Sequence, residues 1–184
     1  MVRLDSNFSC NISNMTVTEI SLVLFMASVI QATITVDRVE MCDPSVDYPI
    51  KWMLKLKNDK NGQVIEEGRL TSRIDLDNNI LETIKIYSLE DKEWMFVLGK
   101  EDFFCDMQKN FFGELATVLE KAAGLEKTCP YPKGTHKVSN FPIDWSKLKF
   151  KDIPDGVIKL TIEYNNVKTN DLLGCLEVEL TCKK

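Results

Sequence analysis

The sequence has few of the residues and motifs from which catalytic and metal sites are usually built. Its 184 residues include a single histidine, His136, which excludes a multi-histidine metal site and leaves one histidine for any catalytic triad. It contains neither a GxGxxG nor a GxxxxGK[ST] motif, so the usual nucleotide-binding loops are missing. None of its six cysteines forms a CxxC pair, which disfavours zinc. We therefore expect a protein that is not an enzyme and that holds no metal and no cofactor.

A surplus of basic residues is missing too. Lys and Arg number 23 against 28 Asp and Glu, which gives a formal net charge of -5. Domains that bind nucleic acid usually carry a basic surplus, so we expect no nucleic-acid partner. With 44% hydrophobic residues, a chain of this length has enough apolar material for one globular core.

The most apolar run of the chain covers residues 20–32. It is too short to cross a bilayer, which takes roughly 20 residues, but it resembles the apolar centre of a signal peptide ending at Ala32. We assign residues 1–32 to a signal-peptide region, with Met15 as a second start, and residues 33–184 to a single domain. The protein is then expected to be secreted and extracellular. The alternative is that the run is a buried core segment.

Beyond residue 32, apolar residues mostly recur at every second position, which is typical of half-buried strands. Such runs cover residues 50–56, 84–86, 94–98, 158–164 and 176–180, and Asn61-Gly62 is a strong hairpin signal between two of the strands. The spacing of strands and turns predicts a mainly β protein, a sandwich or open barrel of about seven to eight antiparallel strands.

One segment departs from this pattern. Between Met107 and Ala123, the apolar residues Phe111, Leu115 and Leu119 are four apart and therefore share one helix face. Gly124 is placed to end that helix. The sequence predicts one helix between strands.

The C-terminal half carries an ordered set of short motifs. Phe104-Cys105-Asp106 precedes the expected helix, Cys129-Pro130 opens a proline-rich turn, Pro154-Asp155-Gly156 leads into a strand, and Leu173-Gly174-Cys175 opens the final strand. This order resembles the ganglioside-activator branch of the ML lipid-recognition proteins. It is most similar to their insect relatives, the secreted Che-type chemosensory proteins, over roughly residues 42–182.

The resemblance implies a β-cup, which is a sandwich opened to hold lipid tails in an internal apolar cavity. It implies a non-enzymatic carrier of a lipid or long-chain apolar ligand, such as a pheromone-like hydrocarbon in chemosensation. One alternative is a lipid-presenting activator of a glycolipid hydrolase, with transient membrane contact; another is a structural sandwich with no ligand. No protein receptor is identified.

The resemblance also implies two disulfides, Cys42 with Cys175 and Cys105 with Cys129. Cys182 lies two residues from the end of the chain and is expected to be a free or adventitious thiol. In a secreted chain such bridges are common, because the compartment is oxidising.

Large aromatic residues are the default material of a core, but some are expected to line the cavity. We predict that the cavity is lined by Trp52, Leu54, Trp94, Phe96, Phe111 and Leu115. Two adjacent phenylalanines cannot both face one core, so we predict a rim of Phe103, Phe104 and Phe112. His136 is expected to be a surface or capping residue.

Overall fold

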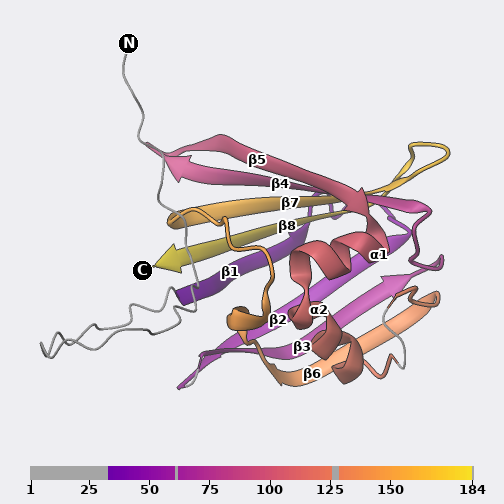
Figure 1. Cartoon of the computed structure of the whole chain (residues 1–184), viewed down its shortest axis with the longest axis horizontal. Coiled ribbons are helices and arrows are strands. Elements are labelled where there is room, and N and C mark those ends of the chain that lie inside the picture. The colour runs from indigo at the N-terminus through magenta and orange to yellow at the C-terminus, as the bar shows by residue number, and fades with distance from the viewer. Residues whose placement is uncertain (1–32, 61, 126–128, 184) are drawn as a thin grey trace, which may run out of the picture.

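The computed structural model describes residues 33–60, 62–125 and 129–183, and strands dominate it (Figure 1). The expected signal-peptide region, residues 1–32 with Met15, lies outside the described residues. The strands are β1 (Thr33–Met41), β2 (Ile50–Asp59), β3 (Gly62–Ser72), β4 (Ile80–Glu90), β5 (Glu93–Phe103), β6 (Gly134–Pro142), β7 (Gly156–Asn166) and β8 (Leu172–Lys183). The helical elements are α1 (Phe104–Met107), the π-helical turn η1 (Gln108–Phe112), α2 (Glu114–Ala122) and the short 3₁₀ turn η2 (Trp145–Lys147).

The strands form two antiparallel sheets. One has the order β1-β8-β7-β4-β5, and the other has the order β2-β3-β6. Alternate residues of the inner strands are buried between the sheets, as Ile80, Ile84 and Ile86 are on β4. The prediction of a mainly β sandwich of seven or eight antiparallel strands is confirmed.

The two sheets are joined at the edge where β1 contacts β2. Gln63 on β3 reaches across the sandwich to β1, where its side-chain carbonyl accepts from the Val36 amide at 2.8 Å and its Nε2 donates to the Val36 carbonyl at 2.6 Å. The β1–β8 register shifts between Val36 and Arg38, next to this contact. One side-chain amide therefore supplies the hydrogen bonds that an edge strand would otherwise lack.

The helical elements lie at the opposite edge, where α1 contacts β5 and α2 contacts β6. In Figure 1 they form one layer in front of the two sheets. The prediction of a single helix over residues 107–123 is wrong, because Gly113 interrupts it. Gly113 has φ +63°, and a Cβ at this position would lie 2.6 Å from the Lys149 Cβ. The chain therefore changes direction between η1 and α2, in a backbone conformation that only glycine adopts readily.

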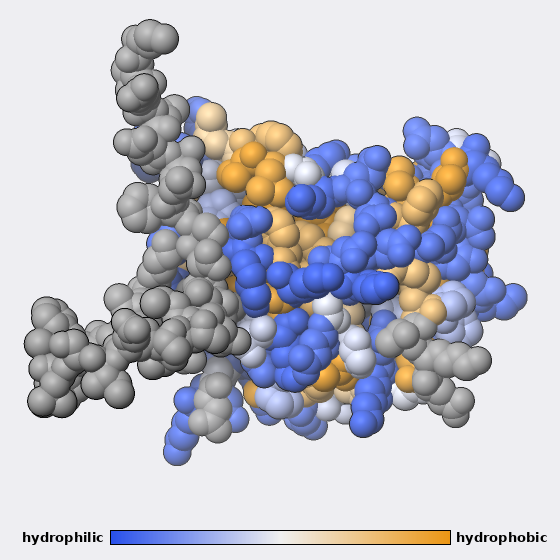
Figure 2. Space-filling view, in the orientation of Figure 1, coloured by the Kyte–Doolittle hydropathy of each residue, from blue (hydrophilic) through white to orange (hydrophobic). Residues whose placement is uncertain are grey.

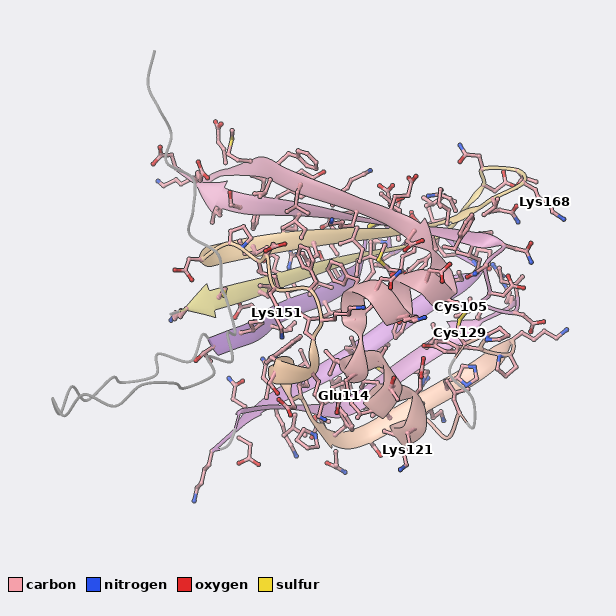
Figure 3. All side chains as sticks on the ribbon, in the orientation of Figure 1. Cys105, Glu114, Lys121, Cys129, Lys151 and Lys168 are labelled. Atoms are coloured by element: carbon pink, nitrogen blue, oxygen red, sulfur yellow. A yellow bond between two sulfur atoms is a disulfide. The ribbon has the colours of Figure 1, made fainter. Side chains whose placement is uncertain are left out.

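Both implied disulfides are present. Cys42, just after β1, is bonded to Cys175 on β8, and Cys105 on α1 is bonded to Cys129 in the loop before β6 (Figure 3). Cys182 is buried and is disulfide-bonded as well, so the prediction of a free thiol is wrong. In the described ranges, no helix has the length and apolar character needed to cross a bilayer.

Candidate functional site

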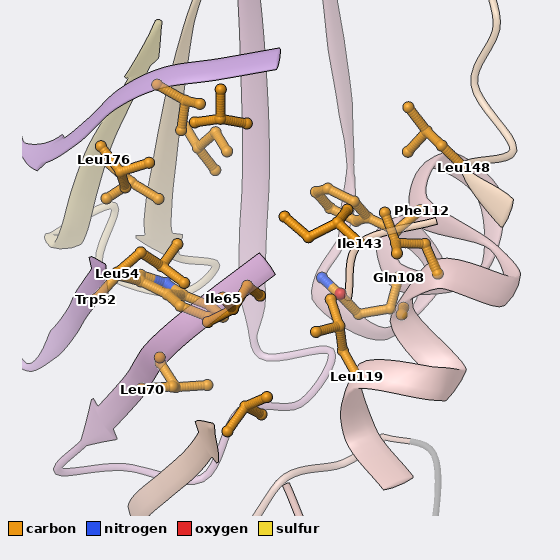
Figure 4. A pocket seen from close by; sticks show the side chains of 18 of the residues that line it. Trp52, Leu54, Ile65, Leu70, Gln108, Phe112, Leu119, Ile143, Leu148 and Leu176 are labelled. Carbon is orange, nitrogen blue, oxygen red and sulfur yellow. The ribbon is translucent and has the colours of Figure 1, made fainter. Parts of the chain in front are cut away.

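The space between the sheets holds a cavity of about 260 Å³ (Figure 4). Residues of β2, β3 and β6 form one wall, and residues of β1, β4, β7 and β8 form the other. The helical segment η1–α2 closes the side between them, with Phe112 and Leu119 pointing toward the strands. Most of the lining is apolar, and the charged or polar exceptions are Arg69, Glu82, Gln108, Glu120 and His136.

Four of the six predicted cavity residues line this space. Trp52 and Leu54 lie on β2, Phe111 lies on η1, and Leu115 lies on α2. Phe111 is buried and stacks on Phe150, with ring centroids 4.6 Å apart. The structure brings these four side chains together from three separate segments of the chain. Their contact with a ligand stays a prediction.

Trp94 and Phe96 do not line the cavity, so their predicted placement is corrected. Both lie on β5, which contributes no lining residue, and Phe96 is 60% exposed. The β4–β5 register shifts by one residue, so Leu98 pairs with the inward Ile86 whereas Phe96 pairs with the outward Tyr87. Such a bulge moves every side chain beyond it to the other face of the sheet, and period-two reasoning does not detect it.

The predicted rim residues separate into three environments. Phe103 is 42% exposed at the end of β5. Phe104 is not at the rim but fully buried, and its ring packs against Tyr131 with centroids 5.2 Å apart, because α1 turns it under the sheet. Phe112 is half-buried, lines the cavity and contacts Phe111 at a centroid distance of 5.0 Å. It is therefore more exposed than Phe111, but it belongs to the wall.

His136, expected as a surface or capping residue, is half-buried on β6 and belongs to the cavity lining. Its Nε2 lies 2.8 Å from the Pro132 carbonyl, which fits a histidine held by the proline-rich turn. The described residues hold no group of histidines, cysteines and carboxylates able to bind a metal ion.

The sequence reading missed a carboxyl group in the wall. Glu82 on β4 is completely buried and lines the cavity. Its Oε2 accepts from Gln108 Nε2 at 3.1 Å, whereas its Oε1 has no hydrogen-bond partner among the described residues. Burial raises the pKa of Glu82 to about 8, and the hydrogen bond from Gln108 opposes this only in part. The missed signal was the alternation Ile80-x-Glu82-x-Ile84-x-Ile86, which places a carboxyl group on an isoleucine face.

A second carboxyl group lies in the helical part of the wall. Glu120 on α2 is buried and lines the cavity, and its Oε1 accepts from the Tyr131 hydroxyl at 2.5 Å. Burial, followed by this hydrogen bond, raises the pKa of Tyr131 well above its ordinary value, and the charge of Glu82 adds to the effect. Both carboxyl groups therefore raise the pKa of the Tyr131 hydroxyl, and all three residues line the cavity.

Comparison with known proteins shows no matching family and no matching curated protein. Among solved structures, chicken MD-1 complexed with lipid IVa is similar over 82% of this chain and 96% of its own, with 13% identity and a TM-score of 0.38. A Niemann-Pick type C2 protein from the Japanese carpenter ant is similar over 78% of this chain and 88% of its own, with 11% identity and a TM-score of 0.27.

Both are ML lipid-recognition proteins, the family that the motif order resembles. Neither bears on the Che-type chemosensory branch, which stays a prediction.

Proposed function

We propose that this chain is a secreted, non-enzymatic protein that binds a lipid or another long-chain apolar ligand between its two sheets. The observation that carries the proposal is the apolar cavity of about 260 Å³. An engineered apolar cavity of about 150 Å³ is enough to bind benzene, and dedicated ligand pockets begin at about 300 Å³. The space therefore suits a slender apolar molecule.

The energy of an unfilled core supports a ligand over a purely structural sandwich. At about 24 cal/mol per Å³, a cavity of this volume costs on the order of 6 kcal/mol of stability. Globular proteins are stable by only about 5–15 kcal/mol, so an empty cavity of this size would remove a large part of the free energy of unfolding. A bound apolar chain restores the missing contacts, at about 25 cal/mol per Å² of apolar surface buried. The disulfides support secretion, because such bonds persist in oxidising compartments.

Displacement of a fluorescent apolar probe, checked by native mass spectrometry of the secreted protein, tests the proposal. Phe111→Asp is expected to abolish binding, because a carboxylate facing an apolar tail is costly to desolvate. Phe96→Asp is the matched control, since it makes the same change on an exposed ring of β5 and is expected to bind as the wild type does.

Val178→Phe provides a second variant should Phe111→Asp fail to fold. Val178 lines the cavity from β8, so a larger ring there narrows the space without burying a charge. We expect its affinity for the probe to fall at least tenfold. A wild-type protein that binds no probe and carries no ligand mass would refute the proposal, as would equal binding by all three variants.

A lipid-presenting activator is the second candidate, and an exposed apolar patch favours it. Leu89, Met95, Phe96 and Val97 are exposed around the β4–β5 turn, and Figure 2 shows apolar surface at the upper left, where this hairpin ends. Large exposed apolar groups in one place are typical of membrane or partner contact. Flotation with liposomes at mildly acidic pH distinguishes an activator from a plain carrier, with Met95→Asp expected to abolish flotation.

The finer assignment, to a carrier of pheromone-like hydrocarbons in chemosensation, has support only from the motif order that resembles the Che-type proteins.

A further inference from the structure

Glu82 occupies an inward position on β4 that packing alone would give to an apolar residue. Ile80 and Ile84 flank it on the same face, and all three side chains are fully buried. Gln108 satisfies one carboxyl oxygen and thereby links η1 to β4. The other oxygen has no partner among the described residues, and an unsatisfied buried polar group costs about 1–3 kcal/mol. The contact between η1 and β4 therefore explains why Oε2 is buried, but it does not explain the buried Oε1.

Glu120 presents a similar arrangement from the helical side. Its Oε1 is bonded to Tyr131, whereas its Oε2 is buried and has no partner among the described residues. Glu82 and Glu120 both line the cavity, so two unsatisfied carboxyl oxygens belong to its mainly apolar wall. The other buried polar atoms of the lining without a partner among the described residues are donors, on Trp52, Arg69 and Trp145. The other titratable groups near Glu82 are Tyr164, opposite it on β7, Asp102, opposite it on β5, and Tyr131, whose pKa the charge of Glu82 helps to raise. No Lys or Arg forms an ion pair with either glutamate among the described salt bridges.

These groups select among ligands by their hydrogen bonds. A plain hydrocarbon would leave both oxygens unsatisfied, at the cost just given. An anionic lipid head would bring a charge into a wall whose one Lys or Arg, Arg69, is already paired with Glu67, and an unpaired buried charge is costly. A hydroxyl group both donates and accepts, so it can satisfy a carboxyl oxygen in either protonation state.

Resting on the proposed function, we propose that the preferred ligand is a neutral long-chain alcohol whose hydroxyl group lies inside the cavity against Glu82, with its apolar chain between the sheets. The polar end of the ligand then lies beside Gln108, which is bonded to Glu82, and the apolar chain fills the rest of the cavity.

The test uses three ligands of equal length, 1-dodecanol, dodecane and dodecanoate, with the full-length protein at neutral pH. The deciding quantity is the affinity for dodecanol relative to dodecane, compared between the wild type and Glu82→Leu, because this ratio cancels the different solubilities of the two ligands. We expect the ratio to fall at least tenfold in Glu82→Leu and dodecanoate to bind the wild type more weakly than dodecanol. Glu82→Gln keeps a donor and an acceptor and is expected to retain the preference.

Glu101→Leu is the matched control, since it removes a carboxyl group from the exposed part of β5 and is expected to leave the ratio unchanged. A crystal structure of the wild type with dodecanol gives a measurement that does not depend on the folding of any variant. A hydroxyl group within hydrogen-bond distance of the Glu82 carboxyl supports the inference, and an apolar chain end there overturns it. Equal ratios in the wild type and Glu82→Leu overturn it while the proposed function stands, whereas a wild type that binds none of the three overturns both.

Discussion

Tyr131 donates its hydroxyl hydrogen to Glu120 across 2.5 Å, which joins the loop after the Cys105–Cys129 disulfide to α2. The Tyr131 backbone also forms two hydrogen bonds with Leu76, at 2.9 and 3.0 Å, and its ring packs edge-on against Phe104. One residue therefore holds the helical side of the cavity against the chain that leads into β4.

Tyr131→Phe removes that hydrogen bond while the ring remains. We expect the free energy of unfolding to fall by about 1–3 kcal/mol, because Glu120 is left buried without a partner on either oxygen. Urea denaturation measures the change. Tyr87→Phe serves as the control, since Tyr87 lies on the outer face against Phe96, and its effect should be within about 0.5 kcal/mol. Equal effects of the two substitutions would contradict this assignment.

Glu82 should make the protein less stable as the pH rises. Its pKa is raised in the folded state from an ordinary 4.5 to about 8, so between these values the folded state binds a proton that the unfolded state does not. Below this interval both states are protonated and the stability is fully present. Within it, the free energy of unfolding should fall by up to about 1.4 kcal/mol per pH unit.

Denaturation midpoints measured across this pH interval test that slope. Glu82→Gln cannot ionise and should remove the slope, whereas Glu101→Gln, which changes an exposed carboxyl group, should keep it. A wild type whose stability is constant between pH 4.5 and 8 would show that Glu82 is not buried in the way described.

Gly113 should tolerate a side chain less well than Gly124. Both have positive φ, +63° and +74°, so alanine is strained at either position. Only at Gly113 does the new Cβ also meet another atom, the Lys149 Cβ at 2.6 Å, whereas at Gly124 it meets nothing within 4 Å. We expect Gly124→Ala to cost about 1 kcal/mol and Gly113→Ala clearly more, by thermal or urea denaturation. Equal losses would mean that Lys149 moves aside freely.

The Cys42–Cys175 and Cys105–Cys129 disulfides should differ in their contribution to stability. The Cys42–Cys175 bond joins residues 133 apart and the Cys105–Cys129 bond joins residues 24 apart. In the loop-entropy model these bonds are worth about 5 and about 3 kcal/mol. Paired Cys→Ser substitutions, compared by denaturation, should show the larger loss for the first pair.

Loss of the Cys105–Cys129 bond should weaken ligand binding more than loss of the Cys42–Cys175 bond. The Cys105–Cys129 bond holds the end of the helical segment that carries Phe111 and Leu115, so its loss should weaken probe binding more than its effect on stability implies. If both paired variants lose affinity only in proportion to stability, the helical segment does not need this bond to keep its place.

Patterns within short stretches of the sequence, together with the order of its motifs, were sufficient to predict the architecture. Period-two alternation predicted the strands, because neighbouring side chains of a strand must point to opposite faces. The motif order implied both the Cys42–Cys175 and the Cys105–Cys129 bonds, and helical spacing placed Phe111 and Leu115 on the inward face. Each of these inferences needed only residues close together in the chain or a known order of motifs.

Tertiary structure decided where that local reasoning was incomplete. A bulge between β4 and β5 turned Trp94 and Phe96 outward, and bulges depend on pairing with a distant strand. The expected helix is divided at Gly113, which has φ +63° and no room for a Cβ beside Lys149. Glu82 became a cavity group because the opposite sheet and η1 exclude water from β4, so its burial depends on segments far from it in the sequence.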